Sequence, residues 1–147
     1  MREVVTKTPQ ETYRLAERMG RVLYGACTIA LEGNLGAGKT VFVQGLAAGL
    51  GIEAPIVSPT FNIVRQYQGR LPLNHFDVYR IEDPEELREI GFSEYLGDGQ
   101  VTVIEWADRI AELLPEQIMR IQIQGAGEAP RRILFHGADS LFREVGK

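Results

Sequence analysis

Residues 32–40 read EGNLGAGKT and are the strongest candidates for chemistry in this chain. Gly33, Gly38, Lys39 and Thr40 match G-x-x-x-x-G-K-[ST], the pattern of a loop whose backbone N–H groups surround the phosphates of a nucleotide. Glycine is needed where the backbone passes close to a phosphate in a conformation that a Cβ would oppose. Lys39 would bring a compact positive charge to the β- and γ-phosphates, and the Thr40 hydroxyl would hold a Mg²⁺ ion.

The segments around this loop decide whether the pattern is meaningful, because such a loop must join a strand to a helix. Residues 27–31 form a short apolar run that is typical of a buried parallel strand. A helix is expected to begin at Lys39, where its N–H groups and positive dipole end point at the phosphates. Its apolar positions recur at helical spacing and are Val41, Phe42, Leu46, Ala47 and Leu50. The alternative is a glycine-rich turn that merely connects two elements.

Length and charge narrow the possible classes of protein. The chain has 147 residues, of which 44% are hydrophobic, so we expect one domain over residues 1–147. The net charge of −4 argues against a surface that coats DNA or RNA, so any connection to RNA is expected to run through another protein. A single cysteine, Cys27, and the lack of a signal pattern or long apolar run predict a cytoplasmic protein outside the membrane.

Two acids stand at the ends of predicted strands. Residues 101–106 form a β-rich apolar run that reaches Glu105, and a carboxylate beside the loop strand would meet the metal held by Thr40. The alternative is a charge that marks the exit of the strand to solvent. Asp77 ends the second strand of a predicted hairpin, which we expect to be more exposed and farther from the loop. It would orient a water or hydroxyl or act on Mg²⁺ indirectly; a solvated outer-face Asp is the alternative.

Three further residues have open interpretations. Thr60 could reach the γ-phosphate as a sensing hydroxyl, or it could be a turn threonine with a local backbone bond. His75 alternates onto the face of Asp77 and is expected to be a packing or hydrogen-bonding residue, with a proton shuttle as the alternative. Trp106 could cover an adenine or a partner protein, but it could equally pack in the core.

The remaining elements complete an α/β pattern. Thr8 is the expected N-cap of a first helix that starts at Pro9 and ends at Gly25, and Val4 starts a strand or an arm. Strands are expected over 62–67, 71–79, 118–124 and 132–136, and helices after Asp83, over 107–114 and in the tail over 138–145. In the helix after Asp83, Leu87 and Ile90 are expected to form the apolar side. The predicted fold is a single three-layer P-loop NTPase domain, with a central mixed sheet that has a parallel core and helices on both faces.

The order of these motifs resembles the bacterial TsaE family. The resemblance covers the loop, the Ser-Pro-Thr at 58–60, the His-Phe-Asp-Val-Tyr-Arg at 75–80, the Asp-Pro-Glu-Glu-Leu at 83–87 and the Val-Ile-Glu-Trp at 103–106. Members of this family are small ATPases that are needed to make N6-threonylcarbamoyladenosine at position 37 of tRNAs reading codons that begin with A. They act with the TsaD–TsaB pair, so tRNA would be reached only through that complex.

The resemblance implies ATP and Mg²⁺ as cofactors and a role for particular residues. It places ATP on Gly36, Ala37, Gly38, Lys39, Thr40 and Val41, with Thr8 at an edge of the adenine pocket. The loop pattern adds Gly33, Asn34 and Leu35 to the expected ATP site. Thr40 and Glu105 would be the Mg²⁺ ligands. Thr60 and Asp77 would be switch-like residues that act in hydrolysis together with Lys39.

Two other classes of function stay open. A small-molecule kinase would need a basic acceptor pocket, for which Arg65, Arg70 and Arg80 are available, although no lid-length insertion is visible. A nucleotide-gated binding module would bind tightly and turn over little. The chain contains no Asn-Lys-x-Asp guanine motif, which disfavours GTP.

Overall fold

The structure is a computed structural model, and it describes residues 1–23, 27–34, 36–59, 62–97 and 99–137. Within these residues the elements are β1 (Arg2–Thr6), α1 (Pro9–Val22), β2 (Cys27–Gly33), α2 (Lys39–Gly49), β3 (Val64–Tyr67), β4 (Leu73–Asp77), α3 (Glu85–Glu89), the 3₁₀ helix η1 (Phe92–Leu96), β5 (Val101–Glu105), the 3₁₀ helix η2 (Ala107–Leu113), β6 (Met119–Gln124) and β7 (Arg131–His136). The expected tail helix, the expected helix end at Gly25, and Leu35 and Thr60 lie outside the described residues.

The seven strands of the described residues form one mixed sheet in the order β1-β7-β6-β2-β5-β4-β3. β2 pairs in parallel with both β6 and β5, and β5 pairs in parallel with β4. The antiparallel strands β7 and β1 extend one edge, and β3 closes the other. The register sets Glu105 opposite Leu31 on one side and opposite Asp77 on the other. The predicted mixed sheet with a parallel core is therefore confirmed.

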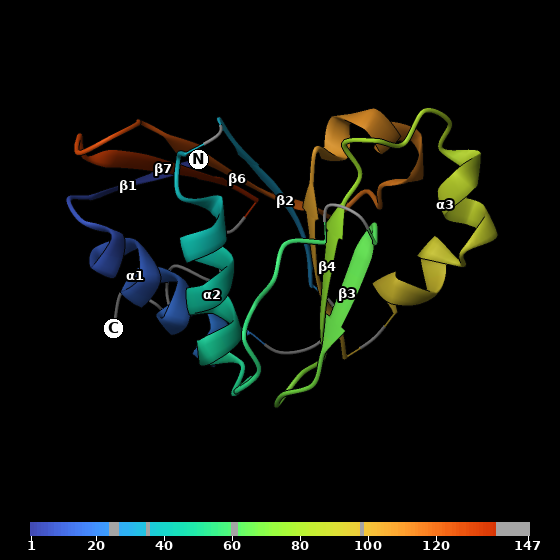
Figure 1. Cartoon of the computed structure of the whole chain (residues 1–147), viewed down its shortest axis with the longest axis horizontal. Coiled ribbons are helices and arrows are strands. Elements are labelled where there is room, and N and C mark those ends of the chain that lie inside the picture. The colour runs from blue at the N-terminus through green and yellow to red at the C-terminus, as the bar shows by residue number, and fades with distance from the viewer. Residues whose placement is uncertain (24–26, 35, 60–61, 98, 138–147) are drawn as a thin grey trace.

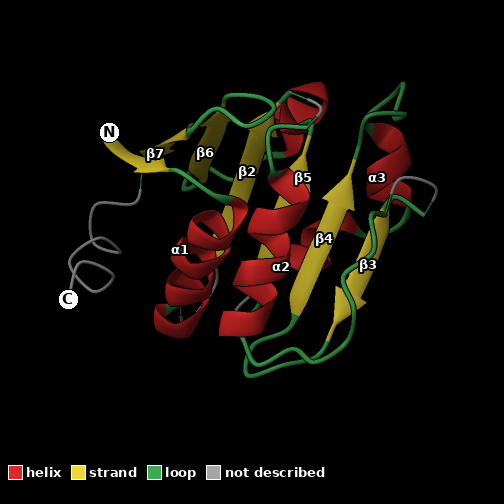
Figure 2. Cartoon of the chain, turned by 60° about the vertical axis from the view of Figure 1, so that its left-hand side comes forward, coloured by secondary structure: helices red, strands yellow, loops and turns green. Residues whose placement is uncertain are grey.

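Helices cover both faces of this sheet, as predicted. Figures 1 and 2 show α1 and α2 lying together over one face, while α3 lies on the other side. The core under α1 and α2 includes Met19, Phe42 and Leu46. A second core under α3, η1 and η2 includes Phe76 and Ile104, with Phe76 meeting Phe92 edge to face at 5.2 Å. The two cores and the sheet between them make the three layers of the domain.

The first helix begins where its sequence predicts. Thr8 is extended, and its hydroxyl accepts a hydrogen bond from the N–H of Glu11 at 3.1 Å. The Glu11 carboxylate in turn accepts one from the N–H of Lys7 at 3.2 Å. This reciprocal arrangement satisfies two N–H groups at the start of the helix. It fixes the position of the first turn of α1, which lines one of the cavities described below.

α1 and α2 approach each other so closely that glycines stand at their contact. A Cβ at Gly45 would lie against the carbonyl oxygen of Tyr13, closer than real Cβ atoms come to such an atom. The same is true of Gly20 against the Leu46 carbonyl oxygen and of Gly49 against that of Glu17. Backbone therefore packs directly on backbone here, and the start of α1 is held near the phosphate loop.

Four expectations about local structure need correction. β4 is an inner strand whose residues from Leu73 to Phe76 are all buried, so it is no more exposed than β5, the strand that ends at Glu105. Ile90 is 43% exposed, and only Leu87 is buried in α3. The expected helix over 107–114 is the 3₁₀ helix η2. The two hairpin strands are also shorter than expected, and residues 68–72 connect them.

The one cysteine is not a reactive thiol. Burial raises the pKa of Cys27 from 9.0 to about 11, so its sulfur stays protonated at neutral pH.

None of the described helices combines the length and the apolar character that crossing a membrane would need.

We predict that Gly45→Ala destabilises the domain although alanine favours helix. The added methyl would force α1 away from α2, which costs about 1–3 kcal/mol for overpacking and exceeds the ~1 kcal/mol that alanine gains over glycine in a helix. Urea unfolding would measure the change, with Gln44→Ala on the exposed side of the same helix as the matched control. An unchanged unfolding midpoint for Gly45→Ala would contradict the close contact.

Candidate functional site: a phosphate loop with two strand-end acids

The loop between β2 and α2 has the geometry of an anion site. Gly36 and Gly38 both adopt positive φ angles, 82° and 106°, and a Cβ at either would meet open space. α2 begins at Lys39, and no side chain caps its first turn. The N–H groups at the start of a helix then need another partner, and an anion such as a phosphate supplies one. The predicted strand, loop and helix are thus all present.

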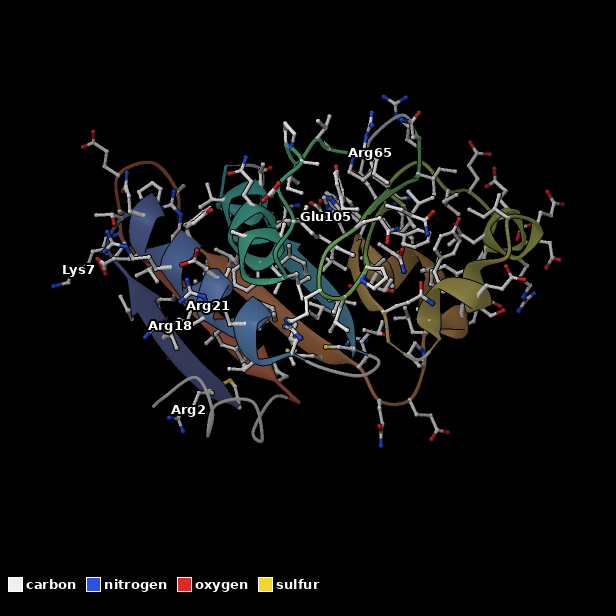
Figure 3. All side chains as sticks on the ribbon, turned by 90° about the horizontal axis from the view of Figure 1, so that it is seen from below. Arg2, Lys7, Arg18, Arg21, Arg65 and Glu105 are labelled. Carbon is white, nitrogen blue, oxygen red and sulfur yellow. The ribbon has the colours of Figure 1, made fainter. Side chains whose placement is uncertain are left out.

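Lys39 and Glu105 meet beside this loop, where Lys39 Nζ lies 3.4 Å from Glu105 Oε1. The two side chains are only 14% and 13% exposed. The other carboxylate oxygen, Oε2, is 2.7 Å from Nε2 of the buried His75. Figure 3 shows Glu105 near the middle of the view, whereas Lys7 lies at its outer edge. Glu105 therefore lies against the lysine of the phosphate loop, and its role as a metal ligand stays a prediction.

The surroundings of Glu105 favour its ionised form. Burial alone would raise the pKa of this carboxyl, but the hydrogen bond from His75 and the charges of His75 and Lys39 offset it. The net result is a pKa below the ordinary 4.5. Glu105 is therefore a carboxylate at neutral pH, which is the form that binds a cation.

Asp77 shares a cavity with Glu105. A cavity of about 370 Å³ is lined by both acids together with Lys39, Thr40 and Ser58, among other residues. The Asp77 carboxylate accepts a hydrogen bond from the N–H of Tyr79 at 3.0 Å. β5 separates β4 from the loop strand β2, in line with the expectation that Asp77 lies farther from the loop than Glu105. The expectation of a more exposed strand is wrong, because β4 is as buried as β5.

Trp106 lies at the mouth of this cavity and not in the core. It is 46% exposed, and its backbone has a positive φ of 66° directly after Glu105. Lys39 Nζ lies 5.1 Å from the centre of the Trp106 ring. The centres of the Trp106 and Tyr79 rings are 4.8 Å apart. The core-packing alternative for Trp106 is therefore wrong.

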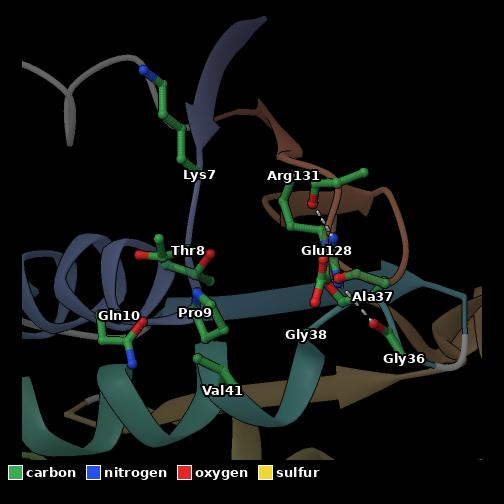
Figure 4. A pocket seen from close by; sticks show the side chains of 13 residues that line it. Lys7, Thr8, Pro9, Gln10, Gly36, Ala37, Gly38, Val41, Glu128 and Arg131 are labelled. Atoms are coloured by element: carbon green, nitrogen blue, oxygen red, sulfur yellow. Dashed lines mark hydrogen bonds between the residues drawn. The ribbon is translucent and has the colours of Figure 1, made fainter.

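A second cavity, of about 440 Å³, adjoins the loop on the side of α1. Figure 4 shows Thr8 and Gln10 on one side of it, Glu128 and Arg131 on the other, and Val41 below. More of its lining is apolar than polar, as is usual in cavities that take a flat ring system. Thr8, predicted at the edge of an adenine pocket, does line a cavity that reaches the loop.

Arg131 is a site residue that sequence reasoning missed. Its guanidinium donates to the carbonyl oxygens of Ala37 at 2.9 Å and Gly36 at 3.3 Å, both in the phosphate loop. It also donates to Gly127 and Ala129, in the turn before β7. Arg131 therefore ties the loop to that turn, and no local pattern in the sequence pointed to this contact.

The sheet order, the loop and the strand-end acid beside it define an α/β domain of the P-loop NTPase class. The sequence profile described as "Threonylcarbamoyl adenosine biosynthesis protein TsaE" matches residues 6–133, and the chain belongs to the TsaE family.

Individual relatives agree with this assignment. The chain is 43% identical over 129 residues to the tRNA threonylcarbamoyladenosine biosynthesis protein TsaE of Treponema pallidum, covering 88% of this chain and 96% of that one. It is 44% identical over 131 residues to the protein of the same name from Bacillus subtilis, covering 88% and 82%. The crystal structure of Bacillus subtilis YdiB superposes with a TM-score of 0.82 at 38% identity, over 99% of this chain and 93% of that one.

We predict that Glu105 makes stability depend on pH in the acid range. Because its pKa is lower in the folded than in the unfolded chain, the carboxylate stabilises the fold above about pH 4.5. That contribution is lost as the pH falls through the folded pKa. The difference in unfolding free energy between wild type and Glu105→Gln should therefore be larger at pH 7 than at pH 3. Glu85→Gln, on the exposed surface, is the control. If wild type and Glu105→Gln differ by the same unfolding free energy at pH 7 and at pH 3, the assignment is contradicted.

Proposed function

We propose that the protein is a Mg²⁺-dependent ATPase required to form the N6-threonylcarbamoyl group on adenosine 37 of tRNAs reading ANN codons, acting with TsaD and TsaB. The observation that carries the proposal is the cavity in which Lys39, Thr40, Asp77 and Glu105 surround the start of α2. The TsaE names of the relatives connect this site to tRNA modification.

The two cavities suggest how a nucleotide lies. The base and ribose fit the apolar cavity at Thr8 and Val41, and the phosphates pass over Gly36 and Gly38 toward Lys39. Within the described residues, no three acidic, His or Cys side chains gather into a metal site of their own. This suits Mg²⁺, which usually keeps waters and shares phosphate oxygens while protein groups such as Thr40 and Glu105 supply one or two ligands. Bound there, the ion would neutralise the charge that develops on the phosphates.

Lys39 would change partners when a nucleotide binds. Its ammonium now lies near Glu105 and over Trp106. Phosphate oxygens offer stronger, charge-assisted hydrogen bonds, so Lys39 would turn to them. The departure of Lys39 would leave Oε1 of Glu105 free for the metal, which joins nucleotide binding to assembly of the metal site.

Asp77 is suited to the chemical step. It faces the same cavity as Glu105 from the neighbouring strand, so its carboxylate can orient the attacking water from the side of the γ-phosphate. Thr60, outside the described residues, is proposed to reach the same phosphate as a sensing hydroxyl.

The kinase alternative receives less support at one of the three arginines that it would use. Arg70 donates to the carbonyl oxygen of Gly20 at 2.5 Å, so its side chain is engaged between α1 and the β3–β4 connection. Among the described residues that line the cavity with both acids, the one cation is Lys39. A phosphate-transfer site of this kind usually has a further positive group, and a partner protein could supply it.

We predict that the pure chain hydrolyses ATP slowly and that TsaD and TsaB together accelerate it. A cation supplied by a partner can be worth ~10³–10⁵ in rate. ADP release would be measured for the chain alone, with TsaD and TsaB, and with tRNA added. Lys39→Ala is the control and should remove ATP binding while the fold is kept. Turnover of roughly 10 per second by the lone chain would contradict the proposal. Transfer of phosphate that depends on an added acceptor would favour a kinase. Tight ATP binding without turnover would favour a binding module.

We predict opposite metal responses for the two acids. Glu105→Gln should weaken the Mg²⁺ dependence of ATP-induced thermal stabilisation, because a metal ligand is lost. Asp77→Asn should keep that response yet abolish hydrolysis, because it removes a charge used only in the chemical step. A Mg²⁺ titration at fixed ATP distinguishes the two variants. If Asp77→Asn loses the response and Glu105→Gln keeps it, the two roles are reversed.

A further inference from the structure

We propose that His75 is a positioning residue that fixes the Glu105 carboxylate, so that a single oxygen of this group faces the phosphate loop. The inference rests on the proposed function, because it gives Glu105 the task of binding a cation. His75 itself lies one layer deeper, with a side chain only 3% exposed, and it lines none of the cavities at the loop.

The two oxygens of Glu105 have different partners. Oε2 is 2.7 Å from His75 Nε2, and an ionised carboxylate can only accept, so Nε2 is the donor. Oε1 lies 3.4 Å from Lys39 Nζ, on the side of the phosphate loop. A carboxylate on a flexible glutamate side chain would otherwise rotate freely between these environments. The hydrogen bond from His75 removes that freedom before any ligand binds.

The sheet itself holds His75 in place for this contact. β4 and β5 pair in parallel, with His75 opposite Val103 and Asp77 opposite Glu105. Side chains two residues apart on a strand share a face, so His75 and Asp77 both lie on the side of α2. Glu105 is the diagonal neighbour of His75 on the adjacent strand. Two long side chains can reach each other across such a diagonal. Both backbones are interior, so neither end of the hydrogen bond can shift easily.

The other ring nitrogen of His75, Nδ1, is buried and has no hydrogen-bond partner among the described residues. Its neighbour in the chain, Asn74, points to the opposite face and donates to Tyr95, Gln100 and Thr102. Asn74 therefore has several hydrogen-bond partners, as a structural polar residue does. The imidazole of His75, by contrast, has one hydrogen bond among the described residues, and it goes to Glu105.

A partner behind a metal ligand has a measurable effect on metal affinity. Groups that hold a ligand in orientation typically contribute roughly 10–100-fold to metal binding or activity. Losing the donor at His75 should therefore weaken the Mg²⁺ response by about that factor. A purely structural role would lower stability without moving the Mg²⁺ midpoint.

Two variants of similar length separate these possibilities. His75→Gln keeps an N–H donor in the same place, and His75→Met keeps the volume without a donor. Mg²⁺ would be titrated at fixed ATP, and the midpoint of thermal stabilisation read for each variant. We expect His75→Met to shift the midpoint by roughly 10–100-fold and His75→Gln to restore it to near the wild-type value. Asn74→Ala, the matched control on the other face, should lower the melting temperature without moving the midpoint.

A second measurement needs no substitution at His75. The chain has two histidines, so a long-range ¹H–¹⁵N spectrum compared with that of His136→Gln identifies the ring of His75. We expect a proton on Nε2 both before and after Mg²⁺ and ATP are added. An unprotonated Nε2, or equal midpoints for His75→Met and wild type, would overturn the inference while the proposed function stood. A wild-type chain without any Mg²⁺ response would instead overturn the proposed function, and this role of His75 with it.

Discussion

The parallel pairing of β5 with β2 is the constraint on which the site depends. It brings the end of an apolar strand level with the start of the phosphate loop, so that Glu105 meets Lys39 at 3.4 Å. β4 pairs with β5 in the same direction and adds Asp77 and His75 to the same face. Parallel strands end at one edge of a sheet, and a ligand crevice at that edge follows from the topology. Every acidic group proposed for catalysis comes from this one edge.

The glycine contact between α1 and α2 extends the site in the other direction. Because Gly20, Gly45 and Gly49 let the two backbones touch, the first turn of α1 stands beside the start of α2. Arg131 closes the same cavity from the far side by binding the carbonyl oxygens of the loop. The loop is therefore held between two elements that are distant in sequence, and its shape does not depend on its own residues alone.

Local signals were readable from the sequence, and long-range ones were not. The cap at Thr8 and the loop ending at Thr40 depend on neighbouring residues, so spacing revealed them. Glu105 was found because an apolar run that ends on an acid is unusual. The burial of β4 was missed because its polar residues Asn74 and His75 weaken the apolar signal, although both are buried through specific contacts. No local pattern could reveal that His75 faces Glu105, since 30 residues separate them.

The charges around the loop argue for help from outside the chain. Asp77 and Glu105 line the cavity with Lys39 as its one cation among the described residues. A bound triphosphate would add several negative charges, and a divalent ion offsets only part of them. Glu105 is already held as a carboxylate by His75, so protonation cannot relieve the excess at neutral pH. The proposed hydrolysis would therefore benefit from a further cation, and the face beside the exposed Tyr79 and Trp106 is where we expect a partner protein to supply it.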